Sequence, residues 1–365
     1  MLNVLHYVAV MDRGGQETFI MNLFRKIDRS KVQFDFLCGE DRAGAYDKEI
    51  KLLGGNIFHL KNRTAPSPLN HFQEVWSLAR FLRTSKTKYD VFHIHTHHAF
   101  SAFLSVLGAK LGGIETIVVH SHNTSAQYHL KAHEFFKKLL RCFTIKRFAC
   151  SEAAGKWLHG NKDFQVIHNG VDLDVFKFDP SKREEVRREL NWEDKQIIGH
   201  IGRFNGQKNH AFLIDIFEAL HAIAPDTQLV LVGKGELEED VRKRVSEKKL
   251  EDAVSFLGVR EDVQRLYQGM DLFLFPSLFE GLSVVLVEAQ TSGLPCLISD
   301  TITTENVFVD NVKQKSLEDS AKEWARVAEH MLETYAERCD TTEVIQAAGY
   351  DMGDLAAKLD TIYMS

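Results

Sequence analysis

Short runs of β-branched and aromatic residues alternate with longer amphipathic segments along this chain, and the alternation occurs twice. In the first half, the runs typical of strands are residues 3–10, 33–38, 91–95 and 115–120. In the second half, they are residues 196–202, 228–232, 254–257, 271–275 and 295–298. Because single helical segments separate these runs, the pattern specifies βαβ units with parallel pairing. The sequence therefore predicts an α/β protein with two doubly wound parallel-sheet domains.

The boundary between the two domains is expected near residue 170. The turn signal Asn169-Gly170-Val171-Asp172 ends the first pattern, and we interpret the charged stretch 179–194 after it as the connection. The predicted domains are residues 1–170 and residues 171–349. Beyond residue 317 the pattern is helical, and the last helix, about residues 350–365, could pack back across the first domain.

Composition and charge exclude several classes of protein. With 44% apolar and 26% charged residues in 365, the chain can bury a large core and is not disordered. No run approaches the roughly 18 consecutive apolar residues of a membrane span, and the first ten residues lack a basic signal region, so we expect a cytoplasmic protein. A formal charge of −6 gives no global reason to bind nucleic acid. The five scattered cysteines lack CxxC spacing, which is typical of reduced thiols.

The first strand is followed by Gly14 and Gly15, just before an apolar-periodic helix that runs from Phe19 to Phe24. Paired glycines let backbone N–H groups approach a phosphate beside a helix N-terminus. An ordinary tight turn would also explain the pair, so it does not specify phosphate binding by itself. Neither GxGxxG nor a Walker sequence is present there, which argues against a dinucleotide or P-loop enzyme.

Two cations, Arg203 and Lys208, follow the first strand of the second domain. Arginine offers a planar fork of donors and lysine a point charge, so the two together could neutralise a diphosphate. A solvated loop would explain either residue taken singly.

The segment 271–295 contains the strongest candidates. An apolar strand at 272–275 leads into a loop with Glu280 and then into a helix with Glu288. A carboxylate at the carboxyl end of a parallel strand can accept hydrogen bonds from sugar hydroxyls, and a second one can bind a ribose diol. The N–H groups of residues 282–284 favour a phosphate. The structural alternative, in which Glu280 caps the helix and Glu288 faces solvent, is equally compatible with this segment alone.

Several motifs occur together, in order, along nearly the whole chain. They are Gly14-Gly15, Arg203 with Lys208, Val232-Gly233-Lys234-Gly235, Phe256-Leu257-Gly258, Pro276-Ser277-Leu278-Phe279-Glu280-Gly281 and Glu288-Ala289. In this combination the chain resembles the retaining GT-B glycosyltransferases of glycosyltransferase family 4. It is similar in particular to the EpsF-type branch, which builds bacterial exopolysaccharide and capsule. That similarity is carried by Arg13-Gly14-Gly15-Gln16-Glu17, Val119-His120-Ser121-His122-Asn123-Thr124 and Val285-Leu286-Val287-Glu288-Ala289-Gln290.

The resemblance implies a GT-B fold, in which two Rossmann-like domains face each other across a cleft. The first domain would bind the acceptor and the second a nucleotide-sugar donor. It further implies retaining transfer of a hexose or N-acetylhexosamine, with UDP favoured over GDP as the carrier. The acceptor would be a glycan or a polyprenyl-diphosphate-linked saccharide.

The resemblance also assigns roles to individual residues. The catalytic residues would be Glu280, His122, Arg203 and Lys208. The residues that bind the donor would be Gly14, Gly15, Arg203, Lys208, Val259, Arg260, Leu282, Ser283, Val284 and Glu288. In the family, the two cations neutralise the leaving diphosphate, Glu280 contacts the transferred sugar and Glu288 the ribose. His122 would lie near the C6 hydroxyl of the sugar, and we interpret His120 as a structural neighbour on the opposite face of the extended segment.

The sequence His93-Ile94-His95-Thr96-His97-His98 invites a metal-site interpretation, because alternate strand residues share one face. However, 17 histidines make chance clusters common, and no Asp-x-Asp sequence lies in a suitable loop. The resembling family stabilises its diphosphate with cationic side chains. We therefore expect no metal site and no cofactor.

Residues 124–148 combine six basic residues with one acid, Glu134, and with apolar residues at helical spacing. Such a basic amphipathic helix could rest on an anionic membrane surface. The alternative, slightly favoured for the apolar stripe, is that the stripe packs on the sheet. Because the resembling branch uses lipid-linked acceptors, we expect peripheral association with the inner face of the cell membrane.

Two other classes of function remain as alternatives. A GT-B-like nucleotide-sugar epimerase would bind the same donor without an acceptor, and a non-catalytic carbohydrate-binding subunit would tolerate Glu280→Gln. The two glutamates, Glu280 and Glu288, favour transfer, and their occurrence with Arg203 and Lys208 argues against a non-catalytic role. The donor sugar, the acceptor and the linkage depend on pocket shape and on loops such as residues 60–70.

Overall fold

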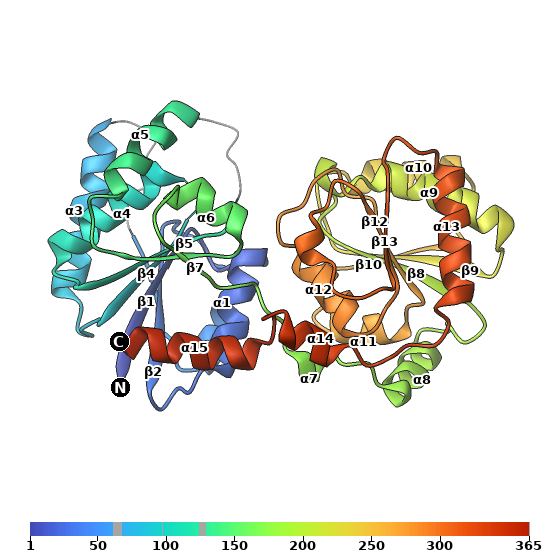
Figure 1. Ribbon diagram of the computed structural model, residues 1–365, viewed down its shortest axis with the longest axis horizontal. Coiled ribbons are helices and arrows are strands. Elements are labelled where there is room, and N and C mark those ends of the chain that lie inside the picture. Colours follow the sequence, from blue (N-terminus) through green and yellow to red (C-terminus); the bar gives the residue numbers. More distant parts are fainter. Residues whose placement is uncertain (61–67, 97, 124–128, 365) are drawn as a thin grey trace. The chain divides into compact units, whose positions relative to one another are not determined.

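The computed structural model describes residues 1–60, 68–96, 98–123 and 129–364. The chain divides into two compact units, Met1–Gly170 with Met352–Ser365, and Val171–Asp351. Each unit is built on one parallel sheet, as Figure 1 shows. The predicted α/β class with two doubly wound parallel sheets is confirmed.

The first sheet has, within the described residues, seven parallel strands in the order β3-β2-β1-β4-β5-β6-β7. They are β1 (Leu2–Val8), β2 (Val32–Cys38), β3 (Ile57–His59), β4 (Val91–Thr96), β5 (Thr116–Ser121), β6 (Lys146–Ala149) and β7 (Gln165–Val166). The direction of winding reverses between β1 and β4. In doubly wound sheets, ligands bind at such a switch point, beyond the carboxyl ends of the strands.

Helices cover both faces of this sheet. One face packs against α1 (Gly15–Lys26), α2 (Asp47–Leu52) and α15 (Met352–Met364). The other packs against α3 (Pro68–Thr84), α4 (Ala99–Gly112), α5 (Leu130–Leu140) and α6 (Glu152–His159). Alternate strand residues divide between the two cores: Val4 and Val8 face α1, whereas Leu5 and Tyr7 face α4.

The last helix, α15, returns to the first unit after the chain has formed the second. Leu355, Leu359 and Tyr363 are buried in the same core as Phe19 and Phe24 of α1. In Figure 1, α15 lies beside α1. The expectation that the C-terminal helix packs on the first domain is confirmed.

The second sheet has six described parallel strands in the order β10-β9-β8-β11-β12-β13. They are β8 (Gln196–Ile201), β9 (Thr227–Val232), β10 (Val254–Gly258), β11 (Leu272–Phe275), β12 (Cys296–Ser299) and β13 (Val312–Lys315). Its switch point lies between β8 and β11, because β9 and β10 extend the sheet in one direction and β11 begins the other.

Two cores also enclose this sheet. The helices on one face are α7 (Leu173–Phe176), α8 (Pro180–Glu189), α11 (Val263–Gly269), α12 (Val284–Thr291) and α14 (Thr342–Ala347). The helices on the other face are α9 (His210–Ile223), α10 (Glu238–Glu247) and α13 (Ala321–Thr334). Two short 3-10 helices, η1 (Gly206–Lys208) and η2 (Thr304–Asn306), lie in loops.

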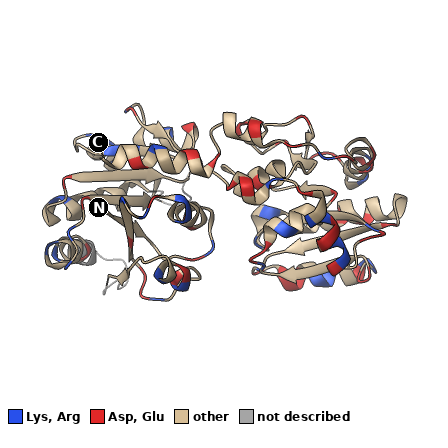
Figure 2. Ribbon diagram, turned by 90° about the horizontal axis from the view of Figure 1, so that it is seen from below, with Lys and Arg blue, Asp and Glu red and all other residues tan. Residues whose placement is uncertain are grey.

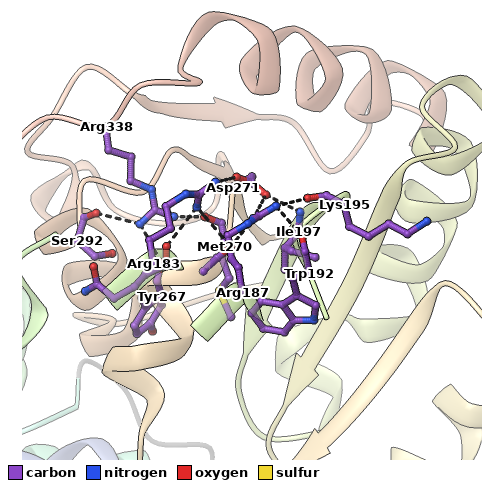
Figure 3. Close-up of polar contacts among 12 residues, drawn as sticks. Arg183, Arg187, Trp192, Lys195, Ile197, Tyr267, Met270, Asp271, Ser292 and Arg338 are labelled. Atoms are coloured by element: carbon purple, nitrogen blue, oxygen red, sulfur yellow. Dashed lines mark hydrogen bonds and ion pairs between the residues drawn. The ribbon is translucent and has the colours of Figure 1, made fainter. Parts of the chain in front are cut away.

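The sequence suggested that the charged stretch 179–194 connects the two units. The structure shows that it does not. It forms α8, and two arginines of α8 bind Asp271 at the start of β11. Arg183 and Arg187 lie 2.5 and 2.9 Å from the Asp271 carboxylate, which also accepts the N–H of Ile197 at 2.7 Å. The charges that resembled a solvated linker therefore hold α8 on the second sheet, as Figure 3 shows.

A third arginine completes this cluster. Arg338, in the segment after α13, donates to the carbonyl oxygens of Tyr267 at 2.8 Å and Ser292 at 3.3 Å, and also to that of Met270 (Figure 3). Burial lowers the pKa of Arg338 to about 9. The backbone carbonyl oxygens thus replace water around a buried cation. Arg338 in this way fixes the segment after α13 to α11 and α12.

Acidic and basic residues are interspersed along the helices of both units, as Figure 2 shows. None of the described helices combines the length and the apolar character that crossing a membrane requires.

Candidate functional site

Lys208 and Glu280 meet at the switch point of the second sheet. Lys208 ends η1, which follows β8, and Glu280 lies in the loop after β11. The Nζ atom of Lys208 is 2.7 Å from Oε1 of Glu280, and their side chains are only 14% and 7% exposed. The structure therefore brings together two of the predicted catalytic residues, where a doubly wound sheet binds its ligand.

Three residues that sequence reasoning missed position Lys208. The side chain of Asn205 accepts the Lys208 N–H at 3.2 Å and so caps η1. The ammonium lies 4.5 Å from the ring centroid of Phe275, a cation–π geometry. A Cβ at Gly202 would come within 3.1 Å of the lysine Cε, so glycine leaves room for the stem. An Asn three residues before the lysine is a capping signal that could have revealed Asn205.

Arg203 has a different environment from Lys208. Its guanidinium contacts Glu236 at 3.1 Å, which links the loop after β8 to the loop after β9. The Arg203 side chain is 70% exposed. Exposed ion pairs of this kind are weak, so an anion that arrives here can displace Glu236 from the guanidinium at low cost.

The loop that holds Glu280 leads directly into α12. That helix, predicted to contain Glu288, spans Val284–Thr291, and its N-cap residue Ser283 makes no side-chain capping hydrogen bond. The hydrogen-bond partner of the Glu280 carboxylate among the described residues is Lys208. The N–H of Leu286 bonds the carbonyl oxygen of Ser283 at 3.1 Å, and the earlier N–H groups of the first turn receive no cap from the Ser283 side chain, which is compatible with the phosphate-binding interpretation.

Glu288 is buried, so the alternative of a solvent-facing helix acid is wrong. Its side chain lies four residues after Val284 and hence on the same face of α12. The phenol of Tyr267 lies 3.1 Å from Glu288 Oε2, and burial raises the pKa of the carboxyl to about 8. Tyr267 precedes the motif region by several residues, and nothing in the sequence pattern indicates its role.

Val259 and Arg260 follow β10, at the same edge of the sheet as Lys208. Val259 is 51% exposed, which suits a residue that offers its backbone to a ligand. Arg260 is held by Asp262 through two contacts of 2.7 Å. Its guanidinium is thus engaged locally.

In the first unit, the paired glycines lie at the N-terminus of α1. Gly14 is the N-cap residue and Gly15 the first residue of the helix, which thus begins four residues before the predicted Phe19. Gly14 itself has no side chain to cap the helix, and the carboxylate of Glu17 lies at this helix end, where a Cβ at Gly14 would clash with its Oε2. A Cβ at Gly15 would meet no described atom within 4 Å, so space for a ligand exists beside it. Burial raises the pKa of Glu17, in the first turn.

His122, which is partly buried, forms a layer with four buried histidines on the α1-facing side of the first sheet. The layer consists of His6, His93, His95, His120 and His122. The prediction that His120 lies on the face opposite His122 is wrong: their ring centroids are 4.2 Å apart. Residues two apart in an extended segment share a face, and the prediction misapplied that rule.

The histidines of the metal-site interpretation are used in different ways. His93 donates to or accepts from the Tyr363 hydroxyl at 2.6 Å, and His98 accepts the N–H of Phe100 as the N-cap of α4. His97 lies outside the described residues. Two other groups of three, His6 with His93 and His95, and His95 with His120 and His122, hold ligand atoms within 4.8 Å of one another. Both nitrogens of His95 already bond other imidazoles.

The basic segment 124–148 does not form one helix. α5 covers only Leu130–Leu140, and residues 124–128 lie outside the described part. Lys146 and Arg147 begin β6, and the Lys146 ammonium donates to the Ile362 carbonyl oxygen at 2.6 Å. The β-branched and aromatic residues around them favour a strand.

On α5 itself, the apolar stripe packs on the fold. Leu140 is buried and Phe136 packs against the same core, so the alternative to a membrane role is confirmed for the stripe. Phe135 and Leu130 remain exposed, at 58% and 53%, beside the exposed Lys138.

Comparisons with known proteins agree with this geometry. The family model of Glycosyltransferase Family 4 matches residues 13–175, and that of Glycosyl transferases group 1 matches residues 182–351. A protein of Bacillus subtilis (strain 168) named as the glycosyltransferase EpsF is 35% identical, over 99% of this chain and 96% of its own length. The UDP-Gal:α-D-GlcNAc-diphosphoundecaprenol α-1,3-galactosyltransferase of Escherichia coli is 29% identical, over 67% of this chain and 66% of its own length.

Among solved structures, Anabaena Alr3699/HepE in complex with UDP and glucose superposes with a TM-score of 0.79. The match covers 100% of both chains at 19% sequence identity, so it bears on the fold alone. Fold and sequence together define a GT-B glycosyltransferase. The chain belongs to glycosyltransferase family 4, and its predicted similarity to EpsF is confirmed.

Proposed function

We propose that the protein is a retaining transferase that moves a hexose or an N-acetylhexosamine from a UDP-sugar to a saccharide acceptor in bacterial exopolysaccharide or capsule synthesis. The observation that carries this proposal is the buried pair of Lys208 and Glu280 at the switch point of the second sheet. It sets a cation for a diphosphate directly beside a carboxylate for sugar hydroxyls. These two chemical groups are adjacent in a nucleotide sugar.

In the proposed reaction, the bond between the anomeric carbon and the phosphate oxygen breaks, and negative charge grows on the departing nucleoside diphosphate. Lys208, Arg203 and the first-turn N–H groups of α12 stabilise that charge. The acceptor hydroxyl attacks on the leaving group's own face, and its proton passes to the departing phosphate oxygen. The configuration is therefore retained without a dedicated general base.

UDP as the carrier is supported by two comparisons. The Anabaena structure is a complex with UDP, and the name of the E. coli relative includes UDP-Gal. In this protein, Glu288 would accept hydrogen bonds from the ribose, and the backbone at Val259 and Arg260 would receive the base. Gly15, beside Gly14, would present its N–H group to the donor phosphate, and His122 would contact the sugar. We expect no metal or other cofactor, so activity should survive treatment with a chelator.

The acceptor is proposed to be a glycan or a polyprenyl-diphosphate-linked saccharide. The name of the E. coli relative contains a diphosphoundecaprenol-linked sugar, which supports this class. Exposed Phe135 and Leu130 on α5, beside Lys138, would hold the enzyme at an anionic membrane where such an acceptor resides. Flotation with anionic vesicles tests this: wild type should float, Phe135→Ser with Lys138→Ser should not, and no flotation of wild type would refute membrane binding.

The function itself is tested first by ligand-dependent melting with UDP, GDP, several UDP-hexoses and UDP-N-acetylhexosamines. A ligand that binds only the folded state raises the midpoint of thermal unfolding. At a ligand concentration of 100 times its Kd, the free energy of unfolding rises by about 2.7 kcal/mol. We expect a shift with UDP and with one UDP-sugar, abolished in Lys208→Met. Lys243→Met is a matched control, because Lys243 is an exposed lysine with a long contact of 3.8 Å to Glu247.

The product analysis then separates the remaining alternatives. A transferase releases UDP only with an acceptor, whereas an epimerase changes the sugar while it is still attached to UDP and needs no acceptor. A non-catalytic subunit would bind the nucleotide sugar without converting it, and this binding would tolerate Glu280→Gln. Absence of any nucleotide-dependent shift would refute the proposal.

A further inference from the structure

Three histidines from two neighbouring strands meet on one face of the first sheet. His95, on β4, and His120, on β5, are partners in the register of this parallel pair. His122 directly follows β5, and its ring centroid is 4.2 Å from that of His120. Each of the three residues offers one ring nitrogen, and these nitrogens lie within 4.8 Å of one another. Only His95 also belongs to the run at residues 93–98 that invites a metal-site interpretation from the sequence.

His120 has an unusual environment for a polar side chain. It is 0% exposed, and neither of its ring nitrogens has a hydrogen-bond partner among the described residues. Its ring meets those of Phe19 and Phe148 in T-shaped contacts, with centroids 5.5 and 5.8 Å apart. Buried polar groups nearly always have a partner, and an exception is explained by a bound water, a bound ion or a chemical role. The nitrogens of His95 and His122 beside it favour an ion.

The three rings are chemically suited to a transition metal. Burial lowers the pKa of His122 to about 3. Burial and the neighbouring imidazoles lower the pKa of His95 and that of His120 well below the ordinary value. At neutral pH each ring is therefore uncharged and carries one lone pair and one N–H. Neutral imidazole is a preferred ligand of Zn²⁺ and of neighbouring divalent ions of the first transition row.

His6 offers the acceptor that a metal-bound His95 requires. A histidine that binds a metal through one nitrogen usually donates its other N–H to a fixed acceptor. His95 Nδ1 faces His122 Nε2, and His95 Nε2 lies 2.9 Å from His6 Nδ1. With its proton on Nε2, His95 donates to His6 and directs the lone pair of Nδ1 into the group of three.

An ion at this position would replace one hydrogen bond and displace no proton from the protein. His95 Nδ1 and His122 Nε2 are now 2.9 Å apart. Two nitrogens bound to one tetrahedral Zn²⁺ lie about 3.3 Å apart, so the rings need to separate by about 0.4 Å. His122 lies beyond the end of its strand and is partly buried, which gives the ion a side of approach. Each ring keeps its single N–H on the nitrogen that does not bind the ion.

We propose that His95, His120 and His122 form a binding site for a divalent transition-metal ion such as Zn²⁺, with His6 as the residue that positions His95. The ion is not a cofactor of transfer. Because His122 is proposed to contact the donor sugar, a bound ion inhibits the enzyme, and the metal-free protein is the active form. This consequence rests on the proposed function, whereas the metal site is a property of the protein without nucleotide.

The test is a titration of the full chain with Zn²⁺, without an affinity tag of histidines and without nucleotide, against a chromophoric chelator that competes for the ion. Wild type should bind one equivalent in competition with the chelator, and His120→Phe should not. His6→Phe should weaken binding about tenfold, an effect typical of losing the acceptor beside a metal-bound histidine. Absence of binding in wild type, or unchanged binding in His120→Phe, would overturn the proposal.

His93→Phe is the matched control. His93 is buried in the same layer, with its ring centroid 4.2 Å from that of His95, but it is not one of the three ligands. This variant should keep the wild-type affinity for Zn²⁺. Binding that is lost in His93→Phe and kept in His120→Phe would place the ion at the other group of three, His6 with His93 and His95, and would overturn the proposal.

Two further measurements cover the case in which His120→Phe does not fold. His122→Asn changes the partly buried end of the group and should also remove the competitive binding of Zn²⁺. Co²⁺ added to wild type should give the intense visible absorption of a four-coordinate ion. Only the weak bands of six-coordinate Co²⁺ would show that surface ligands hold the ion and would overturn the site.

Activity measurements separate the metal site from the proposed function. Once the UDP-sugar is known, Zn²⁺ should inhibit transfer by wild type and by His93→Phe at concentrations near its Kd, and EDTA should restore the activity. His120→Phe should stay active at the same Zn²⁺ concentration. Binding of one Zn²⁺ without inhibition would support the site and contradict the sugar contact proposed for His122.

Discussion

The phenol oxygen of Tyr267, on α11, lies 3.1 Å from Oε2 of Glu288 on α12, and 3.1 Å from the carbonyl oxygen of Val285. Burial and the neighbouring carboxyl raise the pKa of Tyr267 well above its ordinary value, so the phenol keeps its proton and acts as the donor. Tyr267, in the core of the second unit, therefore fixes by a hydrogen bond the carboxyl of Glu288, which is proposed to bind ribose.

This environment makes stability depend on pH in a defined window. The pKa of Glu288 is about 8 in the folded protein, against an ordinary value of 4.5, so folding favours the protonated carboxyl. The contribution of Glu288 to stability is therefore fully present below about pH 4.5 and is lost as the pH rises toward 8. Glu288→Gln should reduce the slope of unfolding free energy against pH in this window, measured by urea unfolding. An identical slope in both proteins would contradict the assignment.

Nucleotide binding should release protons through the same residue. A ribose diol donates to a carboxylate, so binding favours the ionised form of Glu288 and lowers its pKa. Isothermal titration of UDP at pH 7, in buffers of different ionisation enthalpy, should show net proton release in wild type and a smaller release in Glu288→Gln. Proton uptake in wild type would contradict the prediction.

The buried pair of Lys208 and Glu280 should behave as one unit in mutagenesis. Lys208→Met leaves a carboxylate buried without its partner and should cost about 3 kcal/mol of stability. The double variant Lys208→Met with Glu280→Gln should recover much of this loss, because no uncompensated charge remains. Urea unfolding of the wild type, Lys208→Met, Glu280→Gln and the double variant gives the coupling energy between the two side chains. Additive effects of the two substitutions would show that the pair is not coupled.

The arginine cluster around Asp271 should contribute to the stability of the fold and not to nucleotide binding. Asp271→Ala removes the carboxylate shared by Arg183 and Arg187, and should cost about 3 to 5 kcal/mol. Glu247→Ala, which breaks an exposed pair with Lys243, should change stability by no more than about 0.5 kcal/mol. Both variants should keep the wild-type Kd for UDP under conditions in which they are folded. A raised Kd in Asp271→Ala would contradict this separation.

Much of the fold follows from hydrophobic pattern, because the central strands are nearly continuous apolar runs between helices. The strands missed are short or polar ones at the sheet edges or next to them. β13, for example, reads Val-Lys-Gln-Lys, and only its first residue is buried. Such strands are recruited by a sheet that already exists, and their own sequence does not specify them.

The candidate site was predictable to the extent that it is made of motif residues. The sequence identified Lys208 and Glu280, but their direct contact depends on how two loops pack. The same limit explains Asp271: Arg183 and Arg187 are ordinary helix charges until the fold brings the start of β11 to them. The hydrogen bonds that join His6, His95 and His122 were hidden because these residues are far apart in the sequence and meet only through strand order.

The return of α15 to the first unit sets an order for folding during synthesis. Residues 1–170 leave the ribosome before the second unit, but their core lacks Leu355, Leu359 and Tyr363 until α15 has been translated. The second unit, Val171–Asp351, emerges whole before that helix exists. The unit translated first is thus the last to be completed, and a nascent chain that stalls before Met352 would expose the apolar face of α1 to chaperones and proteases.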